Sequence, residues 1–296
     1  MPTATPPSYF IAGTAFSAPP LAPGLYVVAT PIGNLRDITI RALETLAAAD
    51  LVLCEDTRLS ARLLDHYGIR TQRQALHEHN ERERIDDILG LLGEGRAVAL
   101  ISDAGTPLLS DPGFPLVRAV RAAALPVFAV PGPSALLSAL AVAGLPTDSF
   151  SFIGFLPAKT GARDAALAEL ADRQETLVFY ESPRRLEKTL TAMAEAFGDT
   201  REAAVALELT KRFERLSRGS LGELAPEFAS SETKGEAVIL VAGAPEGAAP
   251  LASDWQEALR EALGAEPLRT AVDAVAQAYS LKRRDVYAAA LAIKAE

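Results

Sequence analysis

The loop at residues 102–113, SDAGTPLLSDPG, holds two aspartates, two prolines and two glycines and follows the apolar run VALI. Connections between a strand and a helix usually need only about 2–6 residues. Twelve small, rigid and polar residues at such a place therefore indicate a ligand site rather than a plain connector. Glycines let the backbone approach a ligand closely, and Asp103, just past the strand, can accept a charge-assisted hydrogen bond.

Other loops with polar side chains also follow expected strands, where ligands of an open parallel sheet bind. They are EDTR at 55–58, PGPSA at 131–135, ESPRR at 181–185 and TKRFER at 210–215. Each could also be an ordinary turn or a solvated helix start with a surface ion pair. The loop after the first strand, PIGNLRD, has one glycine and no G-x-G-x-x-G, so no dinucleotide phosphate cradle is expected.

Short apolar runs alternate with helical patterns from residue 25 onward. The expected strands of the first half are 25–30, 51–54, 97–101 and 126–132. This alternation predicts a parallel sheet with helices on both faces. The expected strands of the second half are 150–155, 175–180, 203–209, 216–224 and 236–243. Several of these are close in sequence, which predicts a mixed sheet.

The predicted fold class is α/β, with two α/β domains followed by a small helical C-terminal tail. The expected boundaries are 1–24 for a disordered N-terminal tail, 25–131 and 132–246 for the N-terminal and C-terminal α/β domains, and 253–296 for the helical tail.

The composition is that of a soluble globular protein, with 49% hydrophobic and 23% charged residues in a chain of 296. No apolar run reaches about 18 residues, and the N-terminus lacks Lys and Arg and is interrupted by prolines, so neither a membrane span nor a secretory signal is expected. The single cysteine, Cys54, cannot form an internal disulfide, which is typical of a reducing cytoplasm. The net charge of −9 argues mildly against a nucleic-acid partner.

Six motifs resemble, in this order, those of the ribosomal small-subunit methyltransferase I family within the tetrapyrrole-methylase superfamily. They are LYVVATPIGNLRDIT, CEDTR, SDAGTPLLSDPG, PGPSALLSALAVAGLPTDSFSFIGFLP, FYESPRR and ELTKRFE, and the resemblance covers about residues 25–245. The resemblance implies two α/β domains with a cofactor cleft between them, and a homodimer. It also implies cytoplasmic methyl transfer from S-adenosylmethionine to the ribose 2′-oxygen of a cytidine in small-subunit (16S) ribosomal RNA. The chain departs from the family pattern at Arg184, where many members have His, and at Arg215, where an acidic residue is common.

S-adenosylmethionine carries no phosphate, which agrees with the missing phosphate cradle. Its adenine and ribose can be held by backbone groups of closely approaching loops. From the resemblance and the loop positions, the residues expected to hold the cofactor are Pro31, Ser102, Asp103, Thr106, Ser134, Ala135, Leu209, Ala237 and Val238.

Methyl transfer to a ribose hydroxyl is difficult because that hydroxyl is barely acidic. The enzyme therefore needs a positioned base, or a cation that eases the loss of the proton. The catalytic candidates are Glu181, Lys211 and Asp56, with Glu208 as a further carboxylate, and the sequence does not rank them. The three histidines do not make a metal site, so no metal is expected.

Basic side chains are expected to face the RNA, in spite of the acidic chain, because charges are screened beyond about 8–10 Å. They are Arg58, Arg184, Arg185, Arg212, Lys282, Arg283 and Arg284. The last three would begin the second helix of a helix-turn-helix-like unit at 268–293. The alternative is a helical hairpin packed on the body of the protein.

Two other functions stay open at this point. One is a methyltransferase of a tetrapyrrole-like small molecule, and the other is a non-catalytic RNA-binding assembly factor. The missing glycine fingerprint disfavours a nicotinamide-dependent oxidoreductase.

Overall fold

The computed structural model describes residues 6–77, 80–229, 235–245, 252–279, 281 and 283–295. The chain forms two compact units. The larger unit comprises Met1–Glu169 and Glu175–Ala242, and the smaller one comprises Leu170–Gln174 and Gly243–Glu296. The larger unit contains both sheets of the α/β part, so the division of that part at residues 131 and 132 stays a prediction.

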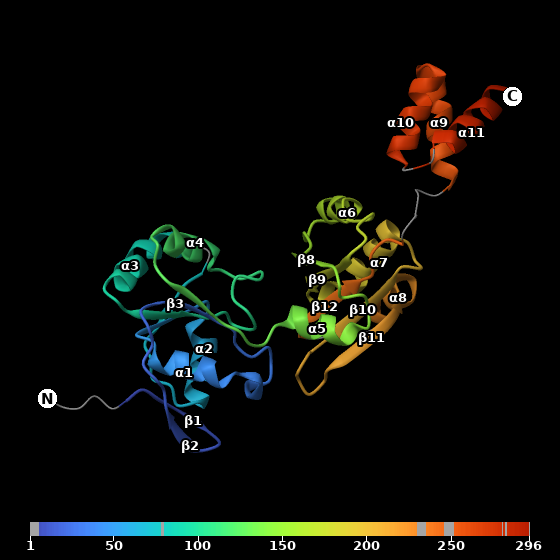
Figure 1. Ribbon diagram of the computed structural model, residues 1–296. Coiled ribbons are helices and arrows are strands. Elements are labelled where there is room, and N and C mark those ends of the chain that lie inside the picture. The colour runs from blue at the N-terminus through green and yellow to red at the C-terminus, as the bar shows by residue number, and fades with distance from the viewer. Residues whose placement is uncertain are drawn as a thin grey trace. The chain divides into compact units, whose positions relative to one another are not determined.

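The first sheet is entirely parallel, with the strand order β5-β4-β6-β3-β7 (Figure 1). Its strands are β3 (Gly24–Val28), β4 (Leu51–Cys54), β5 (Arg73–Ala75), β6 (Ala97–Leu100) and β7 (Val127–Val130). Four of these confirm the expected strands of the first half. The fifth, β5, is a short edge strand that the apolar pattern does not reveal, because it is polar and only half-buried.

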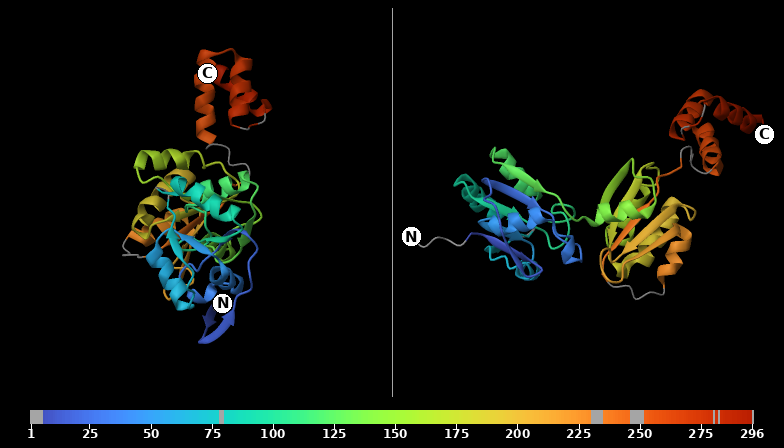
Figure 2. Two further views of the ribbon diagram at one scale, coloured as in Figure 1. Left: turned by 90° about the vertical axis from the view of Figure 1, so that its left-hand side faces the viewer. Right: turned by 60° about the horizontal axis from the view of Figure 1, so that its bottom comes forward.

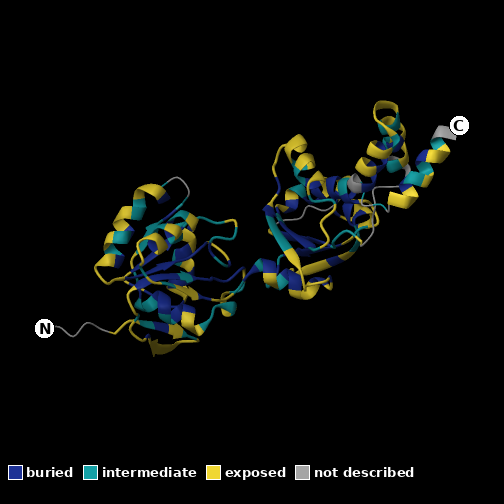
Figure 3. Cartoon of the chain, turned by 45° about the horizontal axis from the view of Figure 1, so that its top comes forward, coloured by how far each residue is buried: buried dark blue, intermediate teal, exposed yellow. Residues whose placement is uncertain are grey.

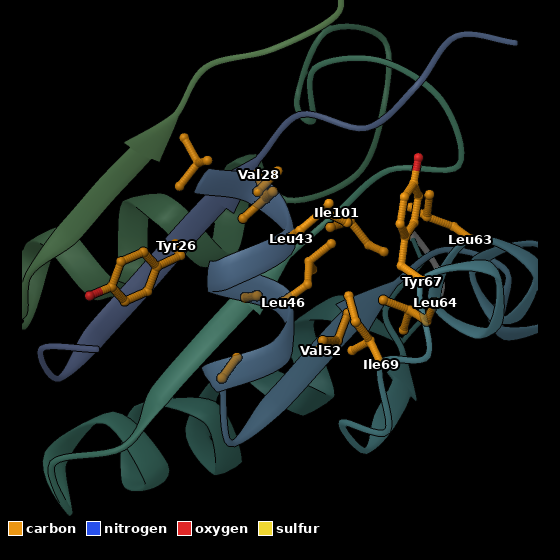
Figure 4. Packing of buried hydrophobic residues seen from close by; sticks show 14 of the residues in the cluster. Tyr26, Val28, Leu43, Leu46, Val52, Leu63, Leu64, Tyr67, Ile69 and Ile101 are labelled. Atoms are coloured by element: carbon orange, nitrogen blue, oxygen red, sulfur yellow. The ribbon is translucent and has the colours of Figure 1, made fainter. Parts of the chain in front are cut away.

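Helices cover both faces of this sheet, as the alternating pattern predicts. They are α1 (Ile40–Ala48), α2 (Thr57–His66), α3 (Glu81–Gly93) and α4 (Phe114–Ala122). On one face, Leu43 and Leu46 of α1 pack with Leu64 of α2 against Val52 of β4 (Figure 4). On the other face, Ile88 of α3 and Leu116 of α4 belong to a second cluster. Figure 3 shows the inner strands β3, β4 and β6 as a dark, buried layer.

The expectation of a disordered N-terminal tail over 1–24 is wrong for the hairpin formed by β1 (Ser8–Ile11) and β2 (Thr14–Ser17). Ala12 and Gly13 turn the hairpin with positive φ angles of 49° and 82°, the geometry that two-residue hairpin loops favour. Tyr9 is only 3% exposed and joins the core cluster of α1 and α2. The segment is therefore ordered by packing against the domain, and residues 1–5 lie outside the described part.

The second sheet is mixed, as expected, with the order β11-β10-β12-β9-β8 and one parallel pair, β8 with β9. Its strands are β8 (Phe150–Phe155), β9 (Thr176–Glu181), β10 (Glu202–Leu207), β11 (Arg215–Ser220) and β12 (Ala237–Val241). The helices of this half are α5 (Ala135–Ala143), α6 (Thr160–Ala168), α7 (Leu186–Phe197) and α8 (Leu221–Ala229). The α5 helix packs on the face that carries Val178, and α7 and α8 lie against the opposite face (Figure 2).

The C-terminal tail is helical, as expected, and has a small core of its own. Its helices are α9 (Ala252–Ala265), α10 (Leu268–Ala278) and α11 (Arg283–Ala295). Leu259, Val272 and Val286, one from each helix, are fully buried in this core. No helix in the described part of the chain is long and apolar enough to cross a membrane.

Candidate functional site

The larger compact unit holds a cavity of about 370 Å³ at the loop of residues 102–113. That loop supplies one wall, from Asp103 to Asp111. The carboxyl end of β9 and the start of β12 supply other walls, through Tyr180 and Ala237. The site thus lies where loops follow the strands, as the position of ligand sites in parallel sheets predicts.

The loop at 102–113 is held in an unusual conformation. Thr30 and Gly105 exchange backbone hydrogen bonds of 2.8 and 3.1 Å, which tie the loop to the end of β3. Leu108 and Ser110 have φ angles of 74° and 66°, a left-handed region that residues with side chains seldom occupy. Backbone strain of this kind persists only where the surrounding structure holds the backbone in place, and it is frequent at binding sites.

The residues expected to hold the cofactor fall into two groups. Those that border the cavity are Asp103, Thr106, Ala135, Ala237 and Val238. The others are buried without lining it: Pro31, Ser102 and Ser134 each precede a lining residue in the sequence, and Leu209 belongs to the same core cluster as the lining residues Ile32 and Val238.

Two of these buried residues have a clear structural role. The Ser134 hydroxyl accepts a hydrogen bond of 3.4 Å from the Leu137 N–H and so begins α5, as expected. The Ser102 hydroxyl donates to the Ala104 and Gly105 carbonyls and braces the loop. Direct contact of these two side chains with a ligand stays a prediction.

Asp111 and Tyr180 border the cavity although the sequence reasoning did not single them out. Burial, together with the nearby carboxylates of Glu55 and Asp103, raises the pKa of Asp111 to about 6, although a hydrogen bond with Ser102 acts in the opposite direction. Burial also raises the pKa of Tyr180, whose oxygen accepts the Leu136 N–H at 3.2 Å. The cavity therefore contains a carboxyl group that titrates near neutral pH, which is a common property of groups that transfer protons.

Lys211 is a fixed cation at the edge of the site. Its ammonium lies 2.9 Å from Glu208 and 3.4 Å from Glu236, and Glu236 borders the cavity. Burial alone would lower the pKa of Lys211, but the two carboxylates outweigh burial and hold the pKa above its usual value. Lys211 therefore stays charged at neutral pH, so it suits electrostatic stabilisation rather than the role of a base.

Asp56 has a structural role that competes with the catalytic one expected for it. Its carboxylate caps α2 by accepting the Arg58 N–H at 2.8 Å and also pairs with the Arg58 guanidinium at 2.9 Å. These hydrogen bonds lower the pKa of Asp56 to about 2, which makes it a weak base. Its own N–H donates to the Asp103 carboxylate at 3.0 Å, so Asp56 positions a cavity residue.

The carboxylate of Glu181 is turned away from the cavity side of the sheet. Alternation along β9 sets Tyr180 toward α5 and Glu181 toward α7. There Glu181 accepts 2.7 Å hydrogen bonds from the Thr189 hydroxyl and the Ser182 N–H, and it pairs with Arg185 at 3.3 Å. Three donors satisfy this buried group, so the geometry favours a structural role, although Glu181 borders the cavity.

The residues expected to face the RNA differ in their solvent exposure and in their partners within the fold. Arg185 also donates to the Leu156 and Pro157 carbonyls and is therefore held within the fold. Arg184 is exposed, and Arg212 lies over the ring of Phe213 at 5.5 Å.

The basic residues of the tail are also exposed where they are described. Arg283 pairs with Asp273 of α10, and Arg284 is 92% exposed beside Asp285. Lys282 lies outside the described residues. Within the described ranges, no group of three or more His, Cys, Asp or Glu side chains could hold a metal ion.

Two protein families match the chain in succession. The family described as Tetrapyrrole (Corrin/Porphyrin) Methylases matches residues 24–225, and the one described as RsmI C-terminal HTH domain matches residues 249–294. The protein named Ribosomal RNA small subunit methyltransferase I from Mesorhizobium japonicum is 49% identical over 95% of this chain and 96% of its own length. The protein of the same name from Pseudomonas aeruginosa is 47% identical over 90% of this chain and 96% of its own length.

Solved structures share the fold at low sequence identity. The methyltransferase CobJ aligns with a TM-score of 0.57 and 22% identity, over 75% of this chain and 94% of its own. The uroporphyrin-III C-methyl transferase from Thermus thermophilus, solved with S-adenyl homocysteine, aligns with a TM-score of 0.52 and 20% identity, over 73% of this chain and 96% of its own. These alignments confirm the predicted fold class.

Proposed function

The chain belongs to the ribosomal RNA small subunit methyltransferase I family within the tetrapyrrole methylases, and we propose that it methylates the ribose 2′-oxygen of a cytidine in small-subunit ribosomal RNA, with S-adenosylmethionine as methyl donor. The observation that carries this proposal is the match over nearly the whole chain, including the C-terminal HTH domain. Because its substrate would be the ribosomal subunit, the enzyme would act in the cytoplasm.

The alternative of a tetrapyrrole-like substrate is weakened by the same tail. The solved methyltransferases with this fold align over almost all of their own length but only about three quarters of this chain. Beyond the methylase match at 24–225, this chain also has the HTH match at 249–294, and helix-turn-helix units commonly contact nucleic acid.

The cavity fits S-adenosylmethionine in size and chemistry. Its volume of about 370 Å³ lies within the usual range of about 300–1,000 Å³ for small-molecule sites. Apolar side chains suited to an adenosyl group and a carboxylate suited to a cationic amino acid group share its wall. The first are Ile32, Leu109, Ala135 and Val238, and the carboxylate expected to face the amino acid group is that of Asp103.

Different residues of the chain would carry out different parts of the methyl transfer. When bound, the cofactor supplies a methyl group activated by a sulfonium cation. We propose that the Asp111 carboxylate is the base that removes the proton of the target hydroxyl, because its raised pKa suits a base near neutral pH. Lys211, held as a cation by Glu208 and Glu236, would stabilise negative charge that develops on the ribose oxygen or a neighbouring phosphate.

A homodimer is part of the proposal, and α5 supports it. Leu137 and Val142 of this helix are 56% and 49% exposed, which is unusual for large apolar side chains on one short helix. A second copy of the chain would cover them. Light scattering should give twice the mass of the chain at micromolar concentration, and Leu137→Glu should shift it toward the monomer.

Labelled S-adenosylmethionine and small subunits that lack the modification test the proposed function directly. We expect label in the ribosomal RNA at a ribose 2′-oxygen, mapped by nuclease digestion. Label that enters a tetrapyrrole but no RNA would contradict the proposal. Binding to the subunit without any transfer would instead support the assembly factor.

A further inference from the structure

Phe213 is the most exposed large apolar side chain among the described residues, with 74% of its surface accessible. It lies in the loop between β10 and β11. Single exposed apolar residues are common on proteins, so exposure alone assigns no role to the ring. The loop that carries Phe213, however, holds the ring in a defined position.

The loop that carries Phe213 is fixed by its own hydrogen bonds. The Thr210 N–H donates to the Glu214 carboxylate at 2.6 Å, and the Lys211 N–H donates to the Glu208 carbonyl at 3.0 Å. Glu208 and Thr210 have φ angles of 49° and 67°, in the left-handed region that side chains disfavour. The ring is therefore presented to solvent by a defined and strained turn.

The surroundings of Phe213 are cationic and close to the cavity. The Arg212 guanidinium lies 5.5 Å from the centre of the ring. Lys211, two residues before Phe213, is paired with Glu236 of the cavity wall. The side chain of Lys211 also crosses Gly33, where a Cβ atom would lie only 3.0 Å from Lys211 Cδ. This packing fixes the loop against the segment that follows β3.

An unpaired nucleotide fits this arrangement better than a protein partner does. Bases stack on exposed aromatic rings and on guanidinium planes, and every base offers a face for such stacking. A protein partner would instead require a continuous apolar patch. The chain neighbours Arg212, Glu214 and Arg215 are all exposed and charged, so the ring has no apolar residue next to it in the chain.

We infer that Phe213 is a stacking platform for an unpaired base of the substrate RNA, and that Arg212 contacts the adjoining phosphate. The inference rests on the proposed function, since it describes how that same site takes its nucleotide. Stacking carries little base preference, so the platform positions the strand beside the cavity and does not select its sequence.

The first experiment measures methylation of small subunits by Phe213→Ala, Phe213→Trp and the control Phe150→Ala. Phe150 is also an exposed aromatic, 39% accessible, but it lies at the opposite end of β8 from the cavity residue Phe155. We expect Phe213→Ala to raise KM for the subunit roughly 5- to 150-fold, the usual effect of losing one stacked base, with a smaller change in kcat. Phe213→Trp and Phe150→Ala should stay within threefold of the wild type.

Cofactor affinity separates this role from a general loss of structure. Calorimetry should give Phe213→Ala the same Kd for S-adenosylmethionine as the wild type. An unchanged KM in Phe213→Ala overturns the platform, and so does a loss of cofactor binding equal to the loss of RNA binding. A shift from dimer to monomer in light scattering with unchanged KM would also overturn it, because the ring would then belong to a contact between copies of the chain.

The second experiment does not depend on methyl transfer and so can fail separately from the proposed function. Its probe is a single-stranded oligoribonucleotide that carries one 2-aminopurine, whose fluorescence is quenched by stacking. The wild type should quench the probe and bind it more tightly than a matched strand with an abasic site at that position. Phe213→Ala should lose both effects. Absence of quenching and of this preference in the wild type overturns the platform, whatever the outcome of the methylation assay.

Discussion

Replacing Asp111 by Asn should stabilise the fold at high pH while it removes activity. The Asp111 carboxyl is half-buried beside the cavity, and the carboxylates of Glu55 and Asp103 face it. An ionised Asp111 therefore lies in an unfavourable place in the folded protein. Asn keeps the shape of the side chain and removes the charge, so the substitution should relieve this repulsion.

The size of the effect follows from the pKa of Asp111, which rises from 3.8 to about 6 on folding. Such a rise corresponds to about 3 kcal/mol at pH values above both pKa values. Water reaches this half-buried group and screens it, so we expect about 1–2 kcal/mol. Because the folded pKa is the higher one, the wild type has its full stability below about pH 3.8 and loses this amount as the pH rises through 6. The advantage of Asp111→Asn is therefore small at pH 4 and complete at pH 8.

Urea unfolding followed by circular dichroism at pH 4 and pH 8 measures the difference between Asp111→Asn and the wild type. Asp148→Asn is the control, because Asp148 is exposed and does not border the cavity. Activity at saturating substrate should fall roughly 10²- to 10⁴-fold in Asp111→Asn, the usual contribution of a general base. In the wild type, it should decline below about pH 6. Equal destabilisation at both pH values, or an unchanged pH profile in the variant, would refute this reasoning.

Other substitutions test the walls of the site. Gly235→Ala should weaken S-adenosylmethionine binding at least about tenfold by calorimetry, because at a φ of 101° the new Cβ is strained and collides with the Glu208 carboxylate. Glu181→Gln should lower the free energy of unfolding by about 1–3 kcal/mol and leave the turnover of the folded enzyme close to normal, since this carboxylate is hydrogen-bonded within the fold. Arg284→Gln should reduce the slope of log affinity against log salt by about 0.7 if this exposed residue contacts a phosphate of single-stranded RNA.

The buried parallel strands could be predicted because their own sequences indicate that they are buried. Leu51–Cys54 and Ala97–Leu100 are buried at every position and appear as continuous apolar runs. The edge strand Arg73–Ala75 and the hairpin at Ser8–Ser17 are different. Their residues become ordered through contacts with parts of the chain distant in sequence, so neither a local pattern nor composition reveals them.

The candidate site shows the same division between local and distant causes. The sequence locates the loop at 102–113, but it does not distinguish the chemistry of the two aspartates in that loop. Only the fold brings Glu55 near Asp111 and leaves the Asp103 side chain exposed. For Glu181, alternation along β9 predicts that it faces away from Tyr180, but the side on which the cavity lies depends on where α5 packs.

The charge distribution of the α/β part bears on how an acidic protein binds RNA. Arg58 and Arg185 are each held by a carboxylate of the same chain. Among the described residues expected to face the RNA in that part, Arg184 and Arg212 have no such partner. Two phosphate contacts would give a slope of log affinity against log salt of only about −1.4 for a single strand. In the α/β part, so shallow a dependence would leave stacking on exposed aromatic rings to supply much of the affinity. A slope near −5 would instead mean that the ion pairs of the fold open when RNA binds.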